Sequence, residues 1–284
     1  MGTTRLSAEG AVGRGLSPAI WQAYGFIGGN FNDPSLIPFF FDDFANFPTY
    51  ATTVAQQGYL TVQDTGVTIQ QCAACDNSEG EFGIMEIGHD GTAHDEGNIE
   101  MGSAKAGLVR IDNTAGERAV VAFEARVKVV TVAVGDCCFA VGLGEPGIAA
   151  ANMIVDTTGA LVAKDFVGFQ TLLTSNSEID AIYSFVTAGV VKVTDKAGTL
   201  VADTWIKLGF VFDPLEATNK KMKYFIDGTE IAYDTAVTDA VIAAGTAFPT
   251  DEELTLCLGT KILTAAATTF YCDWWSVGSY SVDT

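Results

Sequence analysis

Histidine and acidic side chains, which bind divalent cations and move protons, are concentrated in one stretch of this chain. The segment IGHDGTAHDEGNIE, residues 87–100, contains both histidines of the sequence. Its spacing matches neither a calcium-binding EF-hand loop nor a zinc motif. We therefore expect a solvated, glycine-punctuated acidic loop rather than a metal site, and we predict no metal and no cofactor. The candidate ligands are His89, Asp90, His94, Asp95, Glu96 and Glu100.

A second group that could do chemistry is the aromatic pair in FYCDWWSVGSY, residues 270–280. Adjacent tryptophans could form a platform on which a sugar ring stacks. If the segment is a strand, however, alternation puts Trp274 and Trp275 on opposite faces. One of them then belongs to the core. The other faces outward, where we expect protein rather than sugar to cover it. Trp205 opens another strand-like segment and is expected in the core.

The cysteines give little sign of metal chemistry. Cys72-Ala-Ala-Cys75 could be half of a zinc site, but no second pair follows at finger spacing. Reduced thiols are the default without a secretory signal, and Cys257 and Cys272 are expected as small core residues. Cys137 and Cys138 complete the set of six.

The bulk composition narrows the class of protein. With 284 residues and 48% hydrophobic residues, the chain can bury a large core. A formal net charge of −20 disfavours binding to nucleic acid and to anionic membranes. The first residues carry no signal-peptide pattern, and residues 16–32 are too polar for a membrane span.

The segments that must position these groups have sequence patterns that predict β-strands. Short, alternating or β-branched stretches, separated by Gly, Asp, Asn and Thr, recur from residue 39 onward, and 30 glycines stand against 7 prolines. This pattern predicts an all-β antiparallel sandwich over residues 39–284. Asp227-Gly228 predicts a two-residue type I′ hairpin. Residues 1–38 differ: they predict a mostly irregular arm, with a short helix starting at Ser17-Pro18.

Three segments together resemble the concanavalin A-like jelly roll, the fold of legume lectins, laminin-G modules and laminarinase-type glycosidases. They are TWIKLGFVFDP (204–214), KYFIDGTEI (223–231) and FYCDWWSVGSY (270–280). FFFDDF (39–44) is similar to the first strand of such domains. The resemblance covers residues 39–281 and implies that 270–280 is a closing strand beside 39–44.

The resemblance carries over no catalytic residue. Laminarinase-type enzymes carry Glu-x-Asp-x-Glu on one strand, which puts three carboxylates on one face. The sequence lacks this triplet. Glu79, Glu81 and Glu86 have other spacings, and the adjacent Glu252 and Glu253 would point to opposite faces. We therefore expect no enzymatic activity.

These features favour an assembly component. Sequences with a concanavalin A-like body behind a nonperiodic arm resemble tailed-phage virion proteins, especially capsid decoration or cement proteins. This resemblance implies a virion protein on the capsid surface, made in the host cytoplasm. Its partners would be a capsid shell protein and copies of itself. The arm's aromatic residues need a surface to cover, either the protein's own body or another subunit. The predicted assembly contacts are Trp21, Tyr24, Phe26 and Phe31.

Two alternatives stay open. One is a glycan-binding module of lectin or laminin-G type, or a host-attachment protein that binds a surface glycan. The other, less favoured, is a glucanase-type hydrolase whose site is assembled from separate strands.

Overall fold

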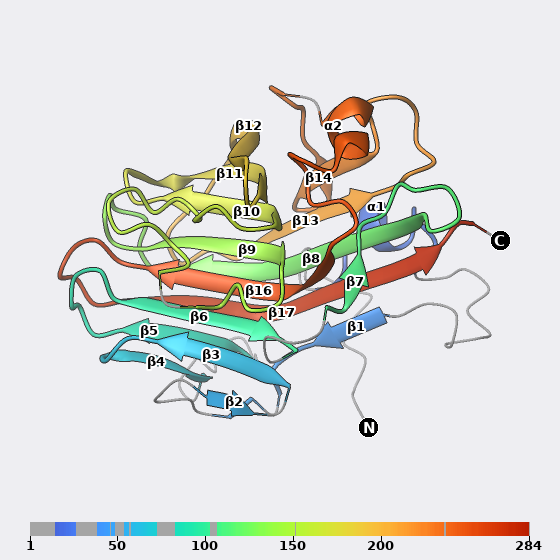
Figure 1. The fold of residues 1–284 in the computed structure, drawn as a ribbon. Helices are drawn as coiled ribbons and strands as arrows, with labels where there is room; N and C mark the ends of the chain where they lie inside the picture. The colour runs from blue at the N-terminus through green and yellow to red at the C-terminus, as the bar shows by residue number, and fades with distance from the viewer. Residues whose placement is uncertain are drawn as a thin grey trace.

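The computed structural model describes residues 15–26, 39–45, 47–48, 54–56, 58–72, 83–102, 107–150, 152–235 and 237–283. It is 49% strand and 4% helix, and two antiparallel sheets form a sandwich. Figure 1 shows the sheets stacked face to face, with helix α2 at one end and α1 behind the strands. This architecture confirms the predicted all-β jelly-roll fold.

The first sheet is built around the closing strand of the chain. Its order is β15 (Thr229–Glu230), β14 (Met222–Ile226), β13 (Ile206–Phe212), β8 (Ala119–Val129), β17 (Thr268–Ser281), β5 (Met85–His89) and β4 (Val67–Gln71), with β1 (Phe39–Asp42) also paired to β17. The pairing of Phe41 with Ser276 confirms that the opening and closing strands are neighbours.

The second sheet faces the first across the core. Its order is β12 (Gly189–Thr199), β11 (Ser175–Phe185), β10 (Phe166–Leu172), β9 (Cys138–Gly144), β16 (Glu253–Lys261), β6 (Glu96–Met101), β3 (Tyr59–Gln63) and β2 (Val54–Gln56), with β7 (Val109–Arg110) also paired to β16. Among the described residues the helices are α1 (Pro18–Trp21) and α2 (Asp239–Ala244), and neither is long and apolar enough to cross a membrane.

The core forms where the inner faces of the two sheets meet. Strand alternation directs Leu208 and Phe210 of β13 inward, and Phe169 of β10 meets them from the other sheet. Phe169 packs edge-on against Tyr224, with ring centroids 5.5 Å apart. The hairpin after Tyr224 turns as predicted, because Asp227 and Gly228 both have positive φ.

A bulge in β17 decides how the tryptophan pair is oriented. Cys272 pairs with Val127 and Trp274 with Arg126, so Asp273 is an extra residue. A bulge inverts the alternation beyond it, so both Cys272 and Trp275 face the core. Asp273 itself binds Arg126, with 2.5 Å between Oδ2 and Nη1.

Trp274 is the outward tryptophan, yet only 3% of it is exposed. The centroid of its ring lies 5.9 Å from the ring centroid of Phe41 on β1. It is therefore not an open sugar platform. The expectation that Trp205 belongs to the core is wrong. Trp205 is half-buried on the outer face of the first sheet, and the Arg126 guanidinium lies 4.4 Å from its ring centroid.

The cysteines follow the sequence-based expectation in part. Cys137, Cys138, Cys257 and Cys272 are buried free thiols, and burial raises the pKa of each. The expectation of reduced thiols is wrong for Cys72, which is disulfide-bonded. Cys72 follows the end of β4 and is only half-buried, so no core packing shields its sulfur.

We predict that Trp275→Ala lowers the free energy of unfolding by about 3–5 kcal/mol, because it opens a cavity among Phe44, Tyr59 and the core strands. Trp205→Ala is the matched control and should cost about 1–2 kcal/mol, since it removes a half-exposed ring and its cation–π contact. Chemical denaturation of both variants measures the difference. Equal losses would contradict the inward placement of Trp275.

Candidate functional site

The N-terminal segment, residues 15–26, lies on the outer face of the first sheet. Its helix starts at Pro18, and the chain then turns through Gly25, whose φ of 76° suits glycine. Ile20, Trp21 and Phe26 form a small apolar cluster with side chains of the underlying strands. Those partners are Val120, Ala122, Val211 and Phe225.

Two glycines make room for this segment. A Cβ atom on Gly209 of β13 would lie 2.6 Å from Cδ1 of Ile20. A Cβ atom on Gly278 of β17 would lie 2.8 Å from the ring of Phe26 and 3.2 Å from that of Trp21. The sheet is therefore shaped to receive these side chains.

A buried carboxylate ties the segment down. Glu124 of β8 is fully buried, and its Oε2 accepts hydrogen bonds from Ser17 N at 2.9 Å and Trp21 Nε1 at 2.8 Å. Burial raises the pKa of Glu124, and the bonds from Ser17 and Trp21 and the nearby Lys207 ammonium partly offset that rise. Lys207 Nζ also donates to Gly15 O at 3.2 Å.

The structure describes three of the four aromatic residues that were predicted as arm contacts. Trp21 and Phe26 are buried against the chain's own body, and Tyr24 is half-buried at its surface. Phe31 lies outside the described residues. Contacts of these residues with another subunit stay a prediction.

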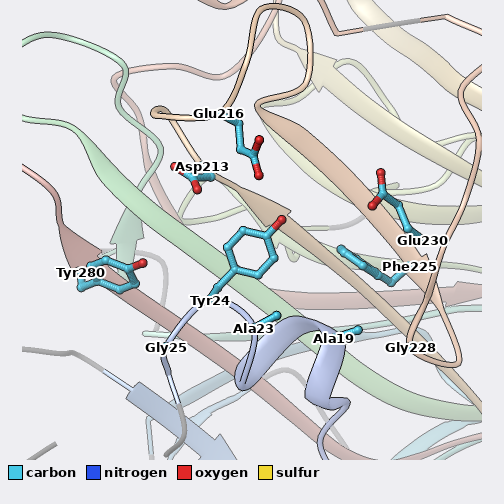
Figure 2. Close-up of a pocket in the computed structure, with 10 residues that line it drawn as sticks. All are labelled: Ala19, Ala23, Tyr24, Gly25, Asp213, Glu216, Phe225, Gly228, Glu230 and Tyr280. Carbon is cyan, nitrogen blue, oxygen red and sulfur yellow. The ribbon is translucent and has the colours of Figure 1, made fainter. Parts of the chain in front are cut away.

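Beside the N-terminal segment, the surface opens into a groove with a volume of about 760 Å³. Figure 2 shows Tyr24 between Tyr280 and Phe225, with its hydroxyl pointing toward the side where Glu216 and Asp213 lie. The lining residues come from the segment, from β14, β15 and β17, and from the turn after β13. They are Ala19, Ala23, Tyr24, Gly25, Asp213, Glu216, Phe225, Gly228, Glu230 and Tyr280.

The polar groups that line the groove differ in how many hydrogen bonds and ion pairs they form within the protein. Lys223 Nζ donates to Tyr24 Oη at 2.7 Å and to Glu216 Oε1, and this ammonium lowers the pKa of Glu216. Asp213 Oδ1 accepts from Leu215 N at 2.9 Å. Within the described part of the chain, Asp213 Oδ2, the Glu230 carboxylate and the Tyr280 hydroxyl form no hydrogen bond or ion pair. These groups are available to a ligand.

The outer face of the second sheet carries an acidic pattern that our sequence reasoning missed. Glu96, Asn98 and Glu100 alternate along β6, with the spacing of the glucanase triplet and asparagine in place of aspartate. Glu96 Oε1 accepts from Asn98 Nδ2 and Ile154 N, and its Oε2 accepts from Lys261. The alternating Glu-x-Asn-x-Glu spacing was the signal in the sequence from which this pattern could have been predicted.

The connection between β9 and β10, residues 145–165, covers this acidic pattern. Both oxygens of Glu100 accept from Gly147 N, and Oε2 also accepts from Ala149 N. Ile148 and Met153 of the connection pack with Phe166 and Cys257. The buried carboxylates of Glu96 and Glu100 therefore anchor the connection over β6 and are engaged by its backbone N–H groups.

The two histidines do not share a site. His89 lies in β5, is buried, and shares a 3.0 Å hydrogen bond from Nε2 to Thr260 Oγ1 of the opposite sheet. Burial lowers the pKa of His89 to about 4. His94 is exposed in the turn before β6. The expectation of a solvated loop across residues 87–100 is wrong for His89 and β6, because they belong to strands that line the interior.

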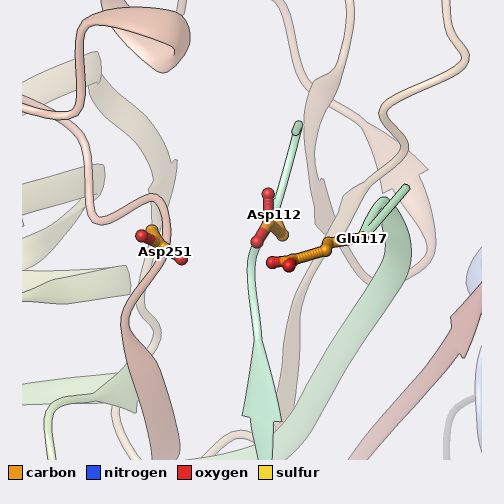
Figure 3. A group of neighbouring side chains, drawn as sticks. All are labelled: Asp112, Glu117 and Asp251. Carbon is orange, nitrogen blue, oxygen red and sulfur yellow. The ribbon is translucent and has the colours of Figure 1, made fainter. Parts of the chain in front are cut away.

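An acidic triad stands elsewhere on the surface. Asp112, Glu117 and Asp251 bring one carboxylate oxygen each within 4.8 Å of the others (Figure 3). The Arg110 guanidinium forms ion pairs with all three, 3.3 Å from Asp112 and 3.4 Å from Glu117. The positive charge of Arg110 thus stands where a cation would have to bind.

Comparison with known proteins supports the fold. No protein-family model matches the sequence, and no curated protein matches it. Among solved structures, peanut lectin is similar with a TM-score of 0.53 and 14% identity, over 84% of this chain and 98% of the lectin. An endo-1,3-β-glucanase from Streptomyces sioyaensis is similar with a TM-score of 0.53 and 15% identity, over 88% and 98%.

A third similar structure is the carbohydrate recognition domain of Emp47p, with a TM-score of 0.51 and 12% identity, over 87% of this chain and 98% of that domain. These neighbours are concanavalin A-like lectin and glucanase jelly rolls. At such identities the likeness shows the fold alone, and it does not separate a lectin from an enzyme.

We predict that Trp21→Phe lowers the free energy of unfolding by about 1–3 kcal/mol near neutral pH, because a buried carboxylate loses a donor. The folded-state pKa of Glu124 is raised, so Glu124 takes up a proton in the folded protein first as the pH falls. The indole N–H mainly stabilises the charged carboxylate. The penalty should therefore shrink as the pH falls through this raised pKa.

Denaturation of Trp21→Phe, Glu124→Gln and the double variant at several pH values measures this coupling. Additive, pH-independent losses would contradict the role assigned to the bond from Trp21 to Glu124.

Proposed function

We propose that this chain is a carbohydrate-binding jelly-roll module and that the groove beside the N-terminal segment is its binding site. The observation that carries this proposal is the groove itself. It is an open cavity of about 760 Å³ that combines half-exposed tyrosine rings with Asp213 Oδ2 and the Glu230 carboxylate, which have no hydrogen-bond or ion-pair partner among the described residues. Sites of this volume commonly hold small ligands.

The lining suits a sugar chemically. A sugar ring has an apolar face of C–H groups and a rim of hydroxyls. Tyr24 and Tyr280 offer flat rings with polar tips, and such rings bury apolar surface while keeping a hydrogen-bonding handle. Asp213 and Glu230 are acceptors for hydroxyl hydrogens. Because the Tyr24 hydroxyl accepts from Lys223, its own proton remains a donor.

Binding is a better proposal than hydrolysis. Glycosidases need two carboxyl groups that flank the bond, one able to give a proton and one able to attack or to activate water. Glu96 and Glu100 have suitable spacing, but backbone N–H groups and Lys261 engage them beneath the β9–β10 connection. Similar structures include a carbohydrate recognition domain and a lectin by name, which supports the proposal at the level of fold.

A second candidate, favoured by a different observation, is the capsid decoration role. Phe39 and Phe41 of β1 are 42% and 41% exposed, side by side on one face of a strand. Large exposed apolar side chains that cluster mark interaction surfaces. A shell protein or a second copy of this chain is the partner that this role requires.

For the binding proposal, we predict that Tyr24→Ala and Tyr280→Ala each weaken saccharide binding about tenfold, because each variant removes a ring that buries apolar area of the sugar. Tyr271→Ala is the control, because Tyr271 is a half-buried tyrosine of the same sheet that does not line the groove. A glycan array followed by calorimetry on the best ligand measures the change. Unaltered affinity in both groove variants would rule out this site.

For the assembly candidate, a double variant, Phe39→Ser and Phe41→Ser, should lose co-sedimentation with capsid shells while still unfolding in one cooperative thermal transition, at a lower melting temperature because the rings pack against Trp21 and Trp274. Val134→Ser and Val201→Ser, two exposed apolar residues elsewhere, form the control. Full occupancy of shells by the phenylalanine double variant would reject β1 as the contact.

A further inference from the structure

The charges around the groove are strongly one-sided. Three carboxylates line it, from Asp213, Glu216 and Glu230, and its ten lining residues include no lysine, arginine or histidine. The adjacent cation, Lys223, is already bound to Glu216 and to the Tyr24 hydroxyl. A ligand therefore meets an excess of negative charge, within a chain whose formal net charge is −20.

From this charge pattern we infer that the groove selects saccharides that carry free amino groups over neutral or uronic acid saccharides. The inference rests on the proposed function, since it names the ligand class of the same groove. An ammonium group on a sugar donates up to three hydrogen bonds and has no acceptor. Such a group matches Asp213 Oδ2 and the Glu230 carboxylate, which have no partner within the described residues.

The position of the aromatic rings fits this assignment. Tyr24 occupies the middle of the groove and Tyr280 one side, while Glu230 and Asp213 stand at different edges (Figure 2). A sugar ring that stacks on Tyr24 can thus direct substituents toward carboxylates on more than one side.

The same charges disfavour an acidic sugar. A carboxylate on a uronic acid would face Asp213, Glu216 and Glu230, and Lys223 would have to leave Glu216 to pair with it. Like charges at close range lower affinity, whereas a neutral N-acetylated sugar carries no charge that the carboxylates attract or repel and keeps only the hydrogen bonds of its hydroxyls. The expected order of affinity is therefore amino sugar, then neutral sugar, then uronic acid.

The test compares three β-linked oligosaccharides of equal length by calorimetry with the full chain: oligoglucosamine, oligo-N-acetylglucosamine and an oligouronate. We expect oligoglucosamine to bind about two- to fivefold more tightly than its N-acetylated match, which is the effect of an exposed ion pair. This margin should shrink as NaCl rises from about 0.02 M to about 0.5 M, because salt screens exposed charges.

Two variants test whether the groove causes this difference in affinity between oligoglucosamine and its N-acetylated match. Glu230→Gln should reduce the affinity for oligoglucosamine about two- to fivefold and that for the N-acetylated match by less, because the glutamine amide oxygen still accepts from a hydroxyl but carries no charge. Glu252→Gln, at an exposed glutamate outside the groove, is the matched control and should change neither.

The outcomes separate the two claims. Equal or tighter binding of the N-acetylated or uronic acid oligomer overturns the charge selection while the saccharide-binding proposal stands. Preference for oligoglucosamine that Glu230→Gln leaves intact also overturns the selection by this groove. Absence of binding to all three oligomers and to a neutral glycan array overturns both claims.

Discussion

The arrangement on the outer face of the first sheet depends on one buried carboxylate. Glu124 has no exposed surface, and its Oε2 accepts one bond from the backbone of Ser17 and one from the indole of Trp21. A buried charge is costly unless hydrogen bonds satisfy it. Only the docked N-terminal segment supplies these two donors, so Glu124 and the segment stabilise each other. The groove exists because this segment stands on the sheet and forms one of its walls.

The outer faces of the two sheets are covered in different ways. Over the second sheet, the β9–β10 connection covers Glu96 and Glu100 and engages both carboxylates with backbone N–H groups. Over the first sheet, a short helix and turn cover part of the face and leave Tyr24, Glu230 and Asp213 beside an open cavity. Carboxylates that look catalytic by spacing are therefore structural. Those that line the groove come from segments with no recognisable motif.

Local signals in the sequence predicted much of the fold. The Asp227-Gly228 turn and the strand alternation depend on neighbouring residues, and the structure confirms them. The placement of residues 270–280 beside 39–44 was implied by the resemblance to concanavalin A-like domains, and the structure confirms that pairing too. The orientation of the tryptophan pair could be predicted only as a split between faces. Which of the two faces the core depends on the bulge at Asp273, and nothing local announces that bulge. His89 was misplaced because its partner, Thr260, lies 171 residues away.

The groove could not be predicted from the sequence, because it too depends on contacts between residues that are far apart along the chain. Tyr24, Asp213 and Tyr280 come together only because α1 docks against β13 and β17, and no spacing along the chain encodes that contact. Gly209 and Gly278 are the residues that permit it, yet in the sequence they look like other strand glycines. The resemblance to lectins and glucanases could not help, since it specifies the sandwich and not the segment that decorates it.

The most direct test of the account is chemical-shift mapping of the full chain by NMR while a glucosamine oligomer is added. We expect shifts that saturate and concentrate at Tyr24, Tyr280, Gly228 and Glu230, with the Trp21 indole N–H still bonded to Glu124. Shifts centred over the β9–β10 connection, or release of the N-terminal segment from Glu124 on binding, would contradict it.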